Sequence, residues 1–280
     1  MPAIPQSLPQ QRGFGLLQTA VGPYCPNLRD DVESVQRLLN FTLGAGGIAL
    51  ESGVLKTDGA FGRKTLEAIE CFERNVLRRS EPSGRIESHS SELVRLCAFM
   101  PRELEPALLA LCYLRAGDDA LDDFAPRIAQ AMAARQIDTP LRRAHFIAQI
   151  GHESGELRFR EEIASGAAYE GRKDLGNTQP GDGCRFKGRG LIQLTGRANY
   201  AEYGRDIGRE AELLEHPQCV ADDPALCVDV AAWFWHKRKL NPLADQDDLL
   251  AITRRINGGL NGLDDRRRLL RRAATILPGA

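Results

Sequence analysis

Apolar residues recur every three or four positions in three short segments early in the chain, and this spacing places them on one face of an α-helix. They fall at positions 32, 35, 38 and 39, at positions 66, 69, 72 and 76, and at positions 93, 96 and 97. Glycine, serine and aspartate residues separate the segments and indicate turns. The pattern therefore predicts a small bundle of three helices.

Two later segments begin with residues that are typical of a helix N-terminus. Thr139-Pro140 and Asp223-Pro224 each combine a side chain that caps free backbone N–H groups with a proline that suits the first helical turn. An arginine-rich helix is expected over residues 266–272, and only residues 157–163 and 191–195 suggest strands. We therefore expect a mainly α fold, with the small bundle followed by a larger helical domain.

The length of 280 residues suits two domains, and four parts can be delimited along the chain. Residues 1–24 are rich in proline, glutamine and glycine without periodicity, and we interpret them as a flexible tail. Residues 25–99 hold the three-helix bundle, and residues 100–122 form a helical connector that Gly117-Asp118-Asp119 interrupts. Residues 123–280 form the larger helical domain.

Composition and charge exclude several classes of protein. A hydrophobic share of 42% with 27% charged residues excludes bulk disorder. The 37 lysines and arginines against 38 aspartates and glutamates leave a net charge of -1, so no nucleic-acid partner is expected. The seven cysteines are widely spaced without a CxxC pair, which indicates reduced, buried thiols rather than a disulfide framework or a zinc site.

Neither a targeting signal nor a membrane span is evident in the sequence. The N-terminus lacks a basic start followed by an apolar stretch, and the longest apolar run is the eight residues 107–114. We therefore expect synthesis in the cytoplasm without a signal peptide and no stable insertion into a membrane.

Candidate chemistry concentrates in residues 145–200. Five carboxyl or hydroxyl side chains lie within ten positions there, namely Glu153, Ser154, Glu156, Glu161 and Glu162. Hydrolysis of a glycosidic bond uses one protonated carboxyl group and often a second, ionised one. On one continuous helix, Glu153 and Glu162 would lie ~13.5 Å apart along the axis, beyond the roughly 6.5 to 9.5 Å of an inverting pair. We therefore expect the helix to stop at Gly155 and the chain to return, bringing Glu161 or Glu162 across a cleft.

Glu153 is the strongest candidate for a proton donor. It follows the nearly apolar stretch 146–151, so we expect it at the end of a helix, where partial burial and the helix dipole favour a neutral acid. His145 and His152 share a helix face, but no third ligand follows at short spacing and HExxH is absent, so no metal site is predicted. GxSxG and phosphate-binding loops are also absent, and no cofactor is expected.

Three segments together resemble the glycoside hydrolases of family 19, specifically the compact lysozyme branch found among phage endolysins. They are AHFIAQIGHESG (144–155), FKGRGLIQLTGRANY (186–200) and INGG (256–259), the last followed by Asp265-Arg266. The resemblance implies a lysozyme-like helical domain of the chitinase type. Plant chitinases of this family place the second glutamate further downstream, so Glu161 remains a rival to Glu162 as the base.

The resemblance also implies a role for each matching residue. Glu153 would be the general acid, Glu162 the general base, and Thr195 the hydroxyl that holds the attacking water. Three amide side chains would hydrogen-bond to the sugars, and Arg266 would orient the carboxylates; the amides are those of Gln193, Asn199 and Asn257.

The first part of the chain has a resemblance of its own. DVESVQRLLN (31–40) and DGAFGRKTLEAIECFERNV (58–76) resemble the small three-helix peptidoglycan-binding domain of cell-wall hydrolases. Asp58-Gly59 would set a tight turn, Phe61 would fill the bundle, and Thr65 would open the second helix. We expect the wall polymer to bind in a groove between the first two helices.

Together these resemblances imply a modular endolysin that hydrolyses the β-1,4 bonds of bacterial peptidoglycan by an inverting two-carboxylate mechanism. Such a monomeric, bacteriolytic enzyme would be made in the bacterial cytoplasm and would reach the host wall through a holin-like pore or a secretion apparatus. A lytic transglycosylase, a chitinase and a noncatalytic wall-binding component remain as alternatives. Of these, the transglycosylase shares the helix that ends in Glu-Ser but uses one carboxyl group and releases an anhydro sugar.

Overall fold

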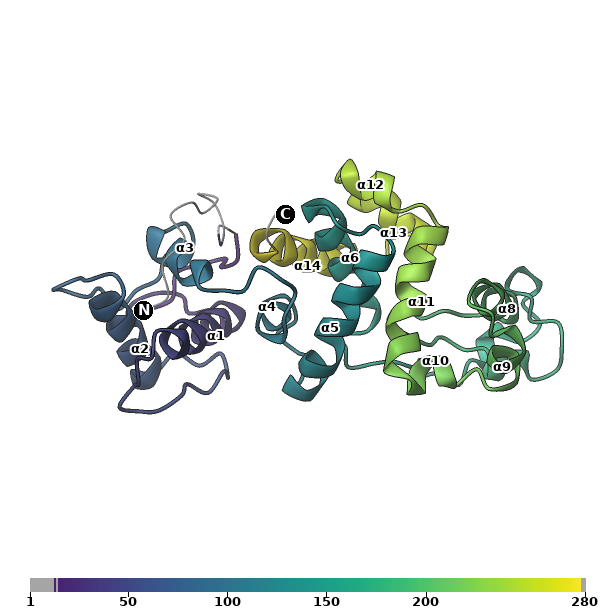
Figure 1. The fold of residues 1–280 in the computed structure, drawn as a ribbon, viewed down its shortest axis with the longest axis horizontal. Helices are drawn as coiled ribbons and strands as arrows, with labels where there is room; N and C mark the ends of the chain where they lie inside the picture. The colour runs from purple at the N-terminus through teal and green to yellow at the C-terminus, as the bar shows by residue number, and fades with distance from the viewer. Residues whose placement is uncertain (1–12, 14, 278–280) are drawn as a thin grey trace. The chain divides into compact units, whose positions relative to one another are not determined.

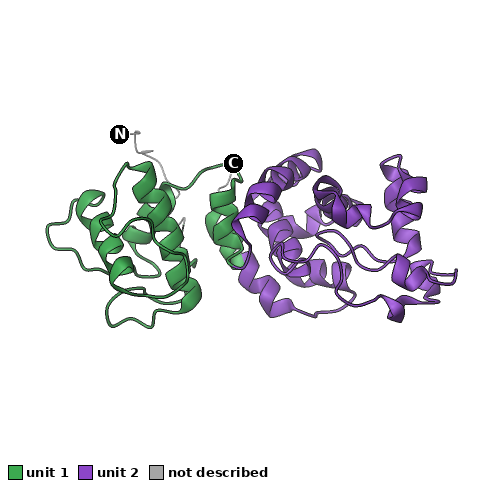
Figure 2. Cartoon of the chain, turned by 90° about the horizontal axis from the view of Figure 1, so that it is seen from below, with its two compact units in different colours: residues 1–114, 271–279 green, residues 115–270, 280 purple. Residues whose placement is uncertain are grey.

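The structure is a computed structural model, and it describes residue 13 and residues 15–277. This part of the chain is mainly helical, which confirms the expected fold class (Figure 1). It divides into two compact units, which Figure 2 shows in green and purple. Among the described residues, the N-terminal unit comprises residue 13 and residues 15–114 and 271–277, and the C-terminal unit comprises residues 115–270. The division thus falls inside the segment expected to be a connector.

The described residues of the N-terminal unit form four helices before the division. They are α1 (Arg29–Ala45), α2 (Arg63–Asn75), α3 (Ser91–Ala98) and α4 (Pro106–Cys112). The first three are the helices that the apolar spacing predicts, and α2, α3 and α4 all contact α1. The four apolar positions at 32, 35, 38 and 39 of α1 are fully buried, as are Ile69, Phe72 and Leu93. The predicted bundle is therefore confirmed, with α4 as an additional member.

The turn at Asp58-Gly59 is fixed by a buried side chain of α1. Gln36 donates from Nε2 to the Asp58 side chain, the Ala60 carbonyl and the Thr65 hydroxyl, and its Oε1 accepts from the Gly59 N–H at 3.0 Å. Phe61, expected to fill the bundle, is only half-buried. The fully buried Phe72 fills the core instead, because it points inward from the middle of α2.

Residues 15–24 do not form the flexible tail that their composition suggests. Leu16, Leu17 and Val21 are buried, and Val21 exchanges backbone hydrogen bonds of 2.9 and 2.8 Å with Ile86. Asp31 accepts hydrogen bonds from the backbone of residues 18 and 19. The prediction is wrong for these residues. Their proline and glycine content indicated a backbone without helix or strand, but such a backbone can still pack against the core. Residues 1–12 and 14 lie outside the described residues.

The C-terminal unit is built from longer helices and a looped region. Its elements are α5 (Asp118–Ala134), α6 (Pro140–Glu153), η1 (Ala167–Tyr169), η2 (Lys173–Leu175), α7 (Asp182–Arg185), α8 (Arg197–Asp206), α9 (Glu210–Glu215), α10 (Cys219–Asp222), α11 (Pro224–Lys237), α12 (Asn241–Asp245), α13 (Leu249–Asn257) and the first part of α14 (Leu263–Ile276). Helix α11 packs along α5, and α12 packs on α6. Phe146 and Trp235 meet edge to face at 5.4 Å in the core.

Both predicted helix starts are confirmed. Thr139 accepts a hydrogen bond from the Arg142 N–H at the start of α6, and Asp223 accepts one from the Ala225 N–H at the start of α11. No described helix is long and apolar enough to cross a membrane. Of the thiols, Cys97, Cys112 and Cys227 are buried as expected, whereas Cys184 is exposed.

The two expected strands do not form in the described residues. In their place stand isolated bridges between Glu161 and Arg189 and between Arg189 and Leu194. Glu156, Leu157 and Gln193 have positive φ angles of 62°, 67° and 56°, which bend the chain where a strand would have to run straight.

Gly59 provides a test of the turn. Its φ is +71°, and an added Cβ would lie 2.5 Å from Arg29 Cγ and 2.7 Å from the Arg29 carbonyl oxygen. Gly53 has a φ of +76° with nothing within 4 Å. We expect Gly59→Ala to lower the free energy of unfolding by about 3 kcal/mol and Gly53→Ala by about 1 kcal/mol. Urea unfolding measures both, and equal losses would show that the contact with Arg29 has no energetic weight.

Candidate active site

Glu153 is the last residue of α6, and the helix stops after it as predicted. Gly155 has a φ of +57°, and an added Cβ there would lie 2.7 Å from a ring carbon of Phe159. Residues 144–151 of the helix are buried, and the Glu153 side chain itself is 18% exposed. The Glu153 carboxyl group therefore lies at the edge of the hydrophobic core and has limited contact with solvent.

Arg266 holds Glu153 from the opposite helix. The Arg266 side chain is fully buried, and its Nη2 donates to Oε1 of Glu153 at 2.5 Å. Its Nη1 donates to Oε1 of Gln149, and its Nε donates to the Asn261 carbonyl at 3.4 Å. The structure thus places Arg266 on one of the two expected catalytic carboxylates.

A second group of charges lies on the same two helices. His152 Nδ1 lies 2.8 Å from Asp265 Oδ2, and Arg268 bridges Asp265 to Glu156 at 2.9 and 2.7 Å. Glu156 also accepts from the Arg115 side chain at 2.6 Å. Burial acts to raise the pKa of Asp265, but hydrogen bonds from His152 and Arg268 hold it below its ordinary value. Glu156 is thus committed to two arginines and is a structural residue.

The chain returns toward residues 188–194 after Gly155. Ser154, another of the candidate hydroxyls, is fully buried and bonds within the turn, donating to the Ile150 carbonyl at 2.7 Å and accepting from the Leu157 N–H at 2.9 Å. Further along, the Glu162 N–H donates to the Gly188 carbonyl at 2.9 Å. The segment after the turn therefore pairs with residue 188 without forming a strand, and the placement of Glu162 across a cleft from Glu153 stays a prediction.

Glu161 and Glu162 have contrasting partners. Glu161 lies 2.8 Å from Arg189 Nε and 3.5 Å from Lys187 Nζ. Glu162 accepts from the Tyr169 hydroxyl at 3.1 Å and from the Gly188 N–H at 3.2 Å, and both of these donors are neutral. Burial and the neighbouring Glu162 carboxylate raise the pKa of Tyr169, so its hydroxyl remains a donor across the neutral range.

Three residues of the segment 193–199 form a chain of hydrogen bonds beside Glu162. Thr195 donates from its hydroxyl to the Gln193 carbonyl at 2.9 Å, and Asn199 donates to the Thr195 carbonyl at 2.7 Å. An added Cβ on Gly188 would meet Gln193 Oε1 at 2.8 Å and Glu162 Oε2 at 3.4 Å, so these two side chains flank the same glycine. The structure thus brings Glu162 and Gln193 together at Gly188, and hydrogen bonds link Thr195 and Asn199 to the same segment as Gln193.

Asn257 is placed differently. It ends α13 with an exposed side chain, and its Nδ2 donates to the Asn261 carbonyl at 3.2 Å within the same turn. Gly262 follows in that turn, and an added Cβ there would lie 2.1 Å from the His152 ring. The turn over residues 257–262 therefore approaches His152 closely at Gly262, just before α14 presents Arg266.

The two histidines of α6 each have a carboxylate partner. His145 is fully buried, and its Nε2 lies 2.8 Å from Asp247 Oδ1, whereas His152 pairs with Asp265. Among the residues that the structure describes, no group of three or more His, Cys, Asp or Glu side chains is arranged to hold a metal ion.

Sequence reasoning missed Tyr169, Gly188 and Gln149. Gln149 could have been found, because it lies four residues before Glu153 and therefore on the same helix face. Tyr169 and Gly188 carry no comparable signal, since loop geometry alone brings them to Glu162.

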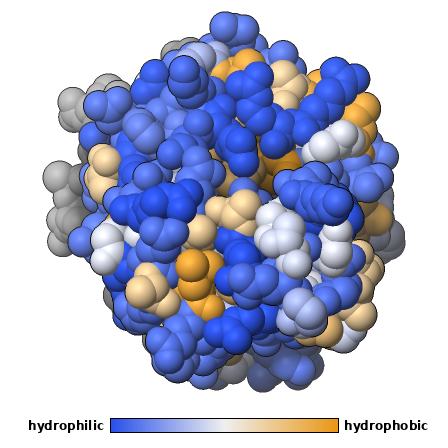
Figure 3. All heavy atoms as spheres, turned by 90° about the vertical axis from the view of Figure 1, so that its right-hand side faces the viewer, coloured by the Kyte–Doolittle hydropathy of each residue, from blue (hydrophilic) through white to orange (hydrophobic). Residues whose placement is uncertain are grey.

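The surface of the C-terminal unit is mainly hydrophilic on the face that Figure 3 shows, with small apolar patches. The large apolar side chains that this unit exposes are Leu141, Phe159, Ile163, Leu250 and Leu260. Ile163 is 83% exposed and directly follows Glu162. An apolar side chain thus lies next to the carboxylate in the sequence and is available to a ligand.

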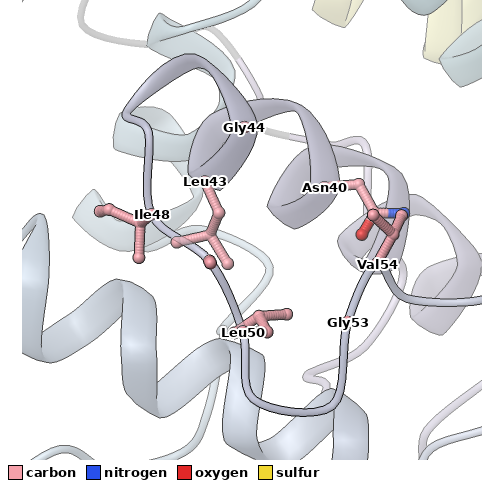
Figure 4. Close-up of a pocket in the computed structure, with 8 residues that line it drawn as sticks. Asn40, Leu43, Gly44, Ile48, Leu50, Gly53 and Val54 are labelled. Atoms are coloured by element: carbon pink, nitrogen blue, oxygen red, sulfur yellow. The ribbon is translucent and has the colours of Figure 1, made fainter.

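The N-terminal unit contains a pocket of about 180 Å³ (Figure 4). Its lining is mainly apolar and comes from Asn40, Leu43, Gly44, Ile48, Ala49, Leu50, Gly53 and Val54. Asn40 fixes the loop by two hydrogen bonds to the Leu55 backbone, of 2.8 and 2.9 Å. The pocket lies between α1 and the loop after it, whereas the sequence suggested a groove between α1 and α2.

Residues 126–250 match the family described as "Chitinase class I". A protein of Haemophilus influenzae named "Glycosyl hydrolase family 19 domain-containing protein" is 36% identical over 162 residues, which cover 47% of this chain and 78% of that protein. An endochitinase of Arabidopsis thaliana is 40% identical over 116 residues, covering 41% of this chain and 39% of the endochitinase. The chain therefore belongs to glycoside hydrolase family 19.

Solved structures agree on the fold. Chitinase C from Streptomyces griseus HUT6037 superposes with a TM-score of 0.52 at 22% identity, covering 62% of this chain and 92% of that one. A class IV chitinase from Zea mays gives a TM-score of 0.51 at 24% identity, with the same coverages of 62% and 92%. The family resemblance and the lysozyme-like helical fold are thus confirmed. The family match begins at residue 126, so the peptidoglycan-binding resemblance of the N-terminal unit stays a prediction.

The buried His145 predicts a pH dependence of stability. Burial lowers its pKa from 6.5, although Asp247 and Asp248 act to raise it. The unfolded chain therefore binds a proton more readily than the folded one, so the stabilising neutral state is lost as the pH falls below about 6.5. We expect the unfolding free energy of His145→Gln to fall less steeply between pH 7.5 and pH 5 than that of the wild type. The exposed His216→Gln serves as control, and identical slopes for all three proteins would contradict the prediction.

Proposed function

We propose that this chain hydrolyses the β-1,4 bonds between the amino sugars of bacterial peptidoglycan by a single displacement with inversion. The observation that carries the proposal is the contrast between two carboxyl groups. Glu153 ends a helix whose central residues are buried and is bound by a buried arginine, and Glu162 is bound on the segment after the turn by neutral donors. Two carboxyl groups with separate environments are what an acid and a base require.

Glu153 donates its proton to the oxygen of the leaving sugar as the glycosidic bond breaks. Glu162 takes a proton from a water molecule, whose oxygen bonds to the anomeric carbon from the opposite side. Thr195 holds that water, and Gln193, Asn199 and Asn257 bind the sugars through their amides. Arg266 keeps Glu153 in place by the contact of 2.5 Å. These steps use only side chains of this chain.

The partners of Glu161 support Glu162 as the base. Glu161 is neutralised by Arg189, whose own side chain is only 7% exposed, and by Lys187. A carboxylate oxygen that two cations already hold is not free to bind the attacking water. Glu162 has neutral donors and leads into the exposed Ile163, whose side chain suits the apolar face of a sugar ring.

The wall as substrate is supported by the N-terminal unit. Its sequence pattern resembles a peptidoglycan-binding domain, and tethering a weak binder to a catalytic unit raises the local enzyme concentration on an insoluble polymer. We therefore propose an endolysin-like, monomeric enzyme that is made in the bacterial cytoplasm and reaches the wall through a holin-like pore or a secretion apparatus. The apolar pocket beside α1 is a further recess of that unit available to a ligand.

Chitin is the second candidate substrate. The relatives that carry a substrate in their name are endochitinases, and the superposed structures are chitinases. Both polymers contain β-1,4-linked N-acetylglucosamine, so the same two carboxyl groups would serve either reaction. The polymers differ in the lactyl-peptide stem of peptidoglycan.

Substitution of the carboxyl groups tests the assignment of acid and base. We expect Glu153→Gln to lower kcat by about 10²- to 10⁴-fold, because the amide cannot donate the proton. Glu162→Gln should lower kcat by about 10²-fold or more, and Glu161→Gln by less than about tenfold. Rates on purified sacculi, with circular dichroism to check the fold, measure these effects. A larger loss for Glu161→Gln than for Glu162→Gln would transfer the role of base to Glu161.

Product masses test the reaction and the substrate. Digests of sacculi and of chitin hexamer should be analysed in parallel by mass spectrometry, with Glu153→Gln as the inactive control. Hydrolysis of peptidoglycan yields reducing muropeptides, which are one water heavier than the anhydro products of a transglycosylase. Cleavage of chitin hexamer with intact sacculi would instead support a chitinase, and anhydro products would contradict hydrolysis.

A further inference from the structure

The side-chain amide of Gln149 is fully buried, and its oxygen has a hydrogen-bond partner whereas its nitrogen has none among the described residues. Its Oε1 accepts a hydrogen bond from Arg266 Nη1. Its Nε2 is buried and has no hydrogen-bond partner among the described residues. Burial of an unpartnered amide N–H group is unfavourable. The hydrogen bond between Arg266 and the Gln149 oxygen therefore goes with an unfavourable burial of the Gln149 nitrogen. Turning the amide over would set its N–H groups against the guanidinium donors, so Arg266 fixes the orientation.

The contact with Gln149 changes how Arg266 binds Glu153. A guanidinium group is a fork that favours two parallel hydrogen bonds to the two oxygens of a carboxylate. Here one arm of the fork, Nη1, is bound to Gln149, and only Nη2 reaches Glu153, at Oε1. Arg266 therefore contacts a single oxygen of the acid.

We propose that Gln149 is a positioning residue that prevents Arg266 from binding both oxygens of Glu153. A carboxyl group that donates a proton needs one oxygen to carry it, and a guanidinium on both oxygens would hold the group ionised. By occupying Nη1, Gln149 leaves Oε2 of Glu153 to carry the proton toward the leaving sugar. The inference rests on the proposed function, in which Glu153 is the acid.

The other charged groups at this end of α6 are bound to one another. His152 pairs with Asp265, and Arg268 joins Asp265 to Glu156. A substitution at Gln149 leaves these contacts in place, since none of them involves Gln149. Its effect on the pH dependence of catalysis should therefore come through Arg266 and Glu153.

Gln149→Met tests the proposal, because methionine keeps the length of the side chain but offers Nη1 no oxygen. We expect kcat on sacculi to fall at least ~10-fold with little change in KM, and the alkaline limb of the pH–rate profile to move to lower pH. Gln149→Glu retains an oxygen for Nη1, and its alkaline limb should not move to lower pH. Thr253→Val is the control for a buried polar-to-apolar change, since Thr253 is fully buried and bonds to the Leu249 carbonyl of its own helix.

A wild-type alkaline limb in Gln149→Met, or a downward shift in Gln149→Glu, would overturn the proposal. If Gln149→Met does not fold, the Gln149→Glu profile alone decides: a shift of its alkaline limb to lower pH contradicts the proposal, and the absence of such a shift supports it. A wild-type protein that cleaves neither sacculi nor chitin would contradict the proposed function itself. An active wild type with an unaltered Gln149→Met profile would contradict only the role of Gln149.

Discussion

The buried guanidinium of Arg266 is the interaction on which the site depends. A charge that is fully removed from water must be paired, and Glu153 and Gln149 supply its partners from one face of α6. The contact ties the end of α6 to the start of α14. Neighbouring residues support this contact: Gly262 lets the chain before α14 approach His152, and Asp265 binds that histidine.

The four glutamates of this region likewise differ in the charged and neutral groups that bind them. Glu156 and Glu161 are each bound by two cations and are parts of the framework. Glu153 has one arginine on one oxygen, and Glu162 has a hydroxyl and a backbone N–H. All four lie within ten residues of one another in the sequence, and their hydrogen-bond partners in the structure differ. In this fold, proposed catalytic glutamates and structural glutamates thus lie within ten residues of each other in the sequence.

Features that arise from local sequence were predictable, and features that arise from distant contacts were not. The caps Thr139 and Asp223 and the stop at Gly155 act within one helical turn, so the sequence reveals them directly. The burial of residues 15–24 depends on Val21 meeting Ile86, which no local pattern predicts. The alternation in residues 157–163 indicated a strand, but the positive φ of Glu156 and Leu157 bends the chain instead. The choice between Glu161 and Glu162 likewise required the positions of Arg189 and Tyr169.

The stereochemistry of the first product is the most direct measurement of whether two carboxyl groups act in a single displacement. Proton NMR can follow the newly formed reducing end of a β-1,4-linked amino-sugar oligomer before the anomers equilibrate. Direct attack of a water that Glu162 activates places the new hydroxyl opposite the broken bond, so the α-anomer should appear first. Initial release of the β-anomer would show that the configuration is retained and would contradict the two roles assigned to Glu153 and Glu162.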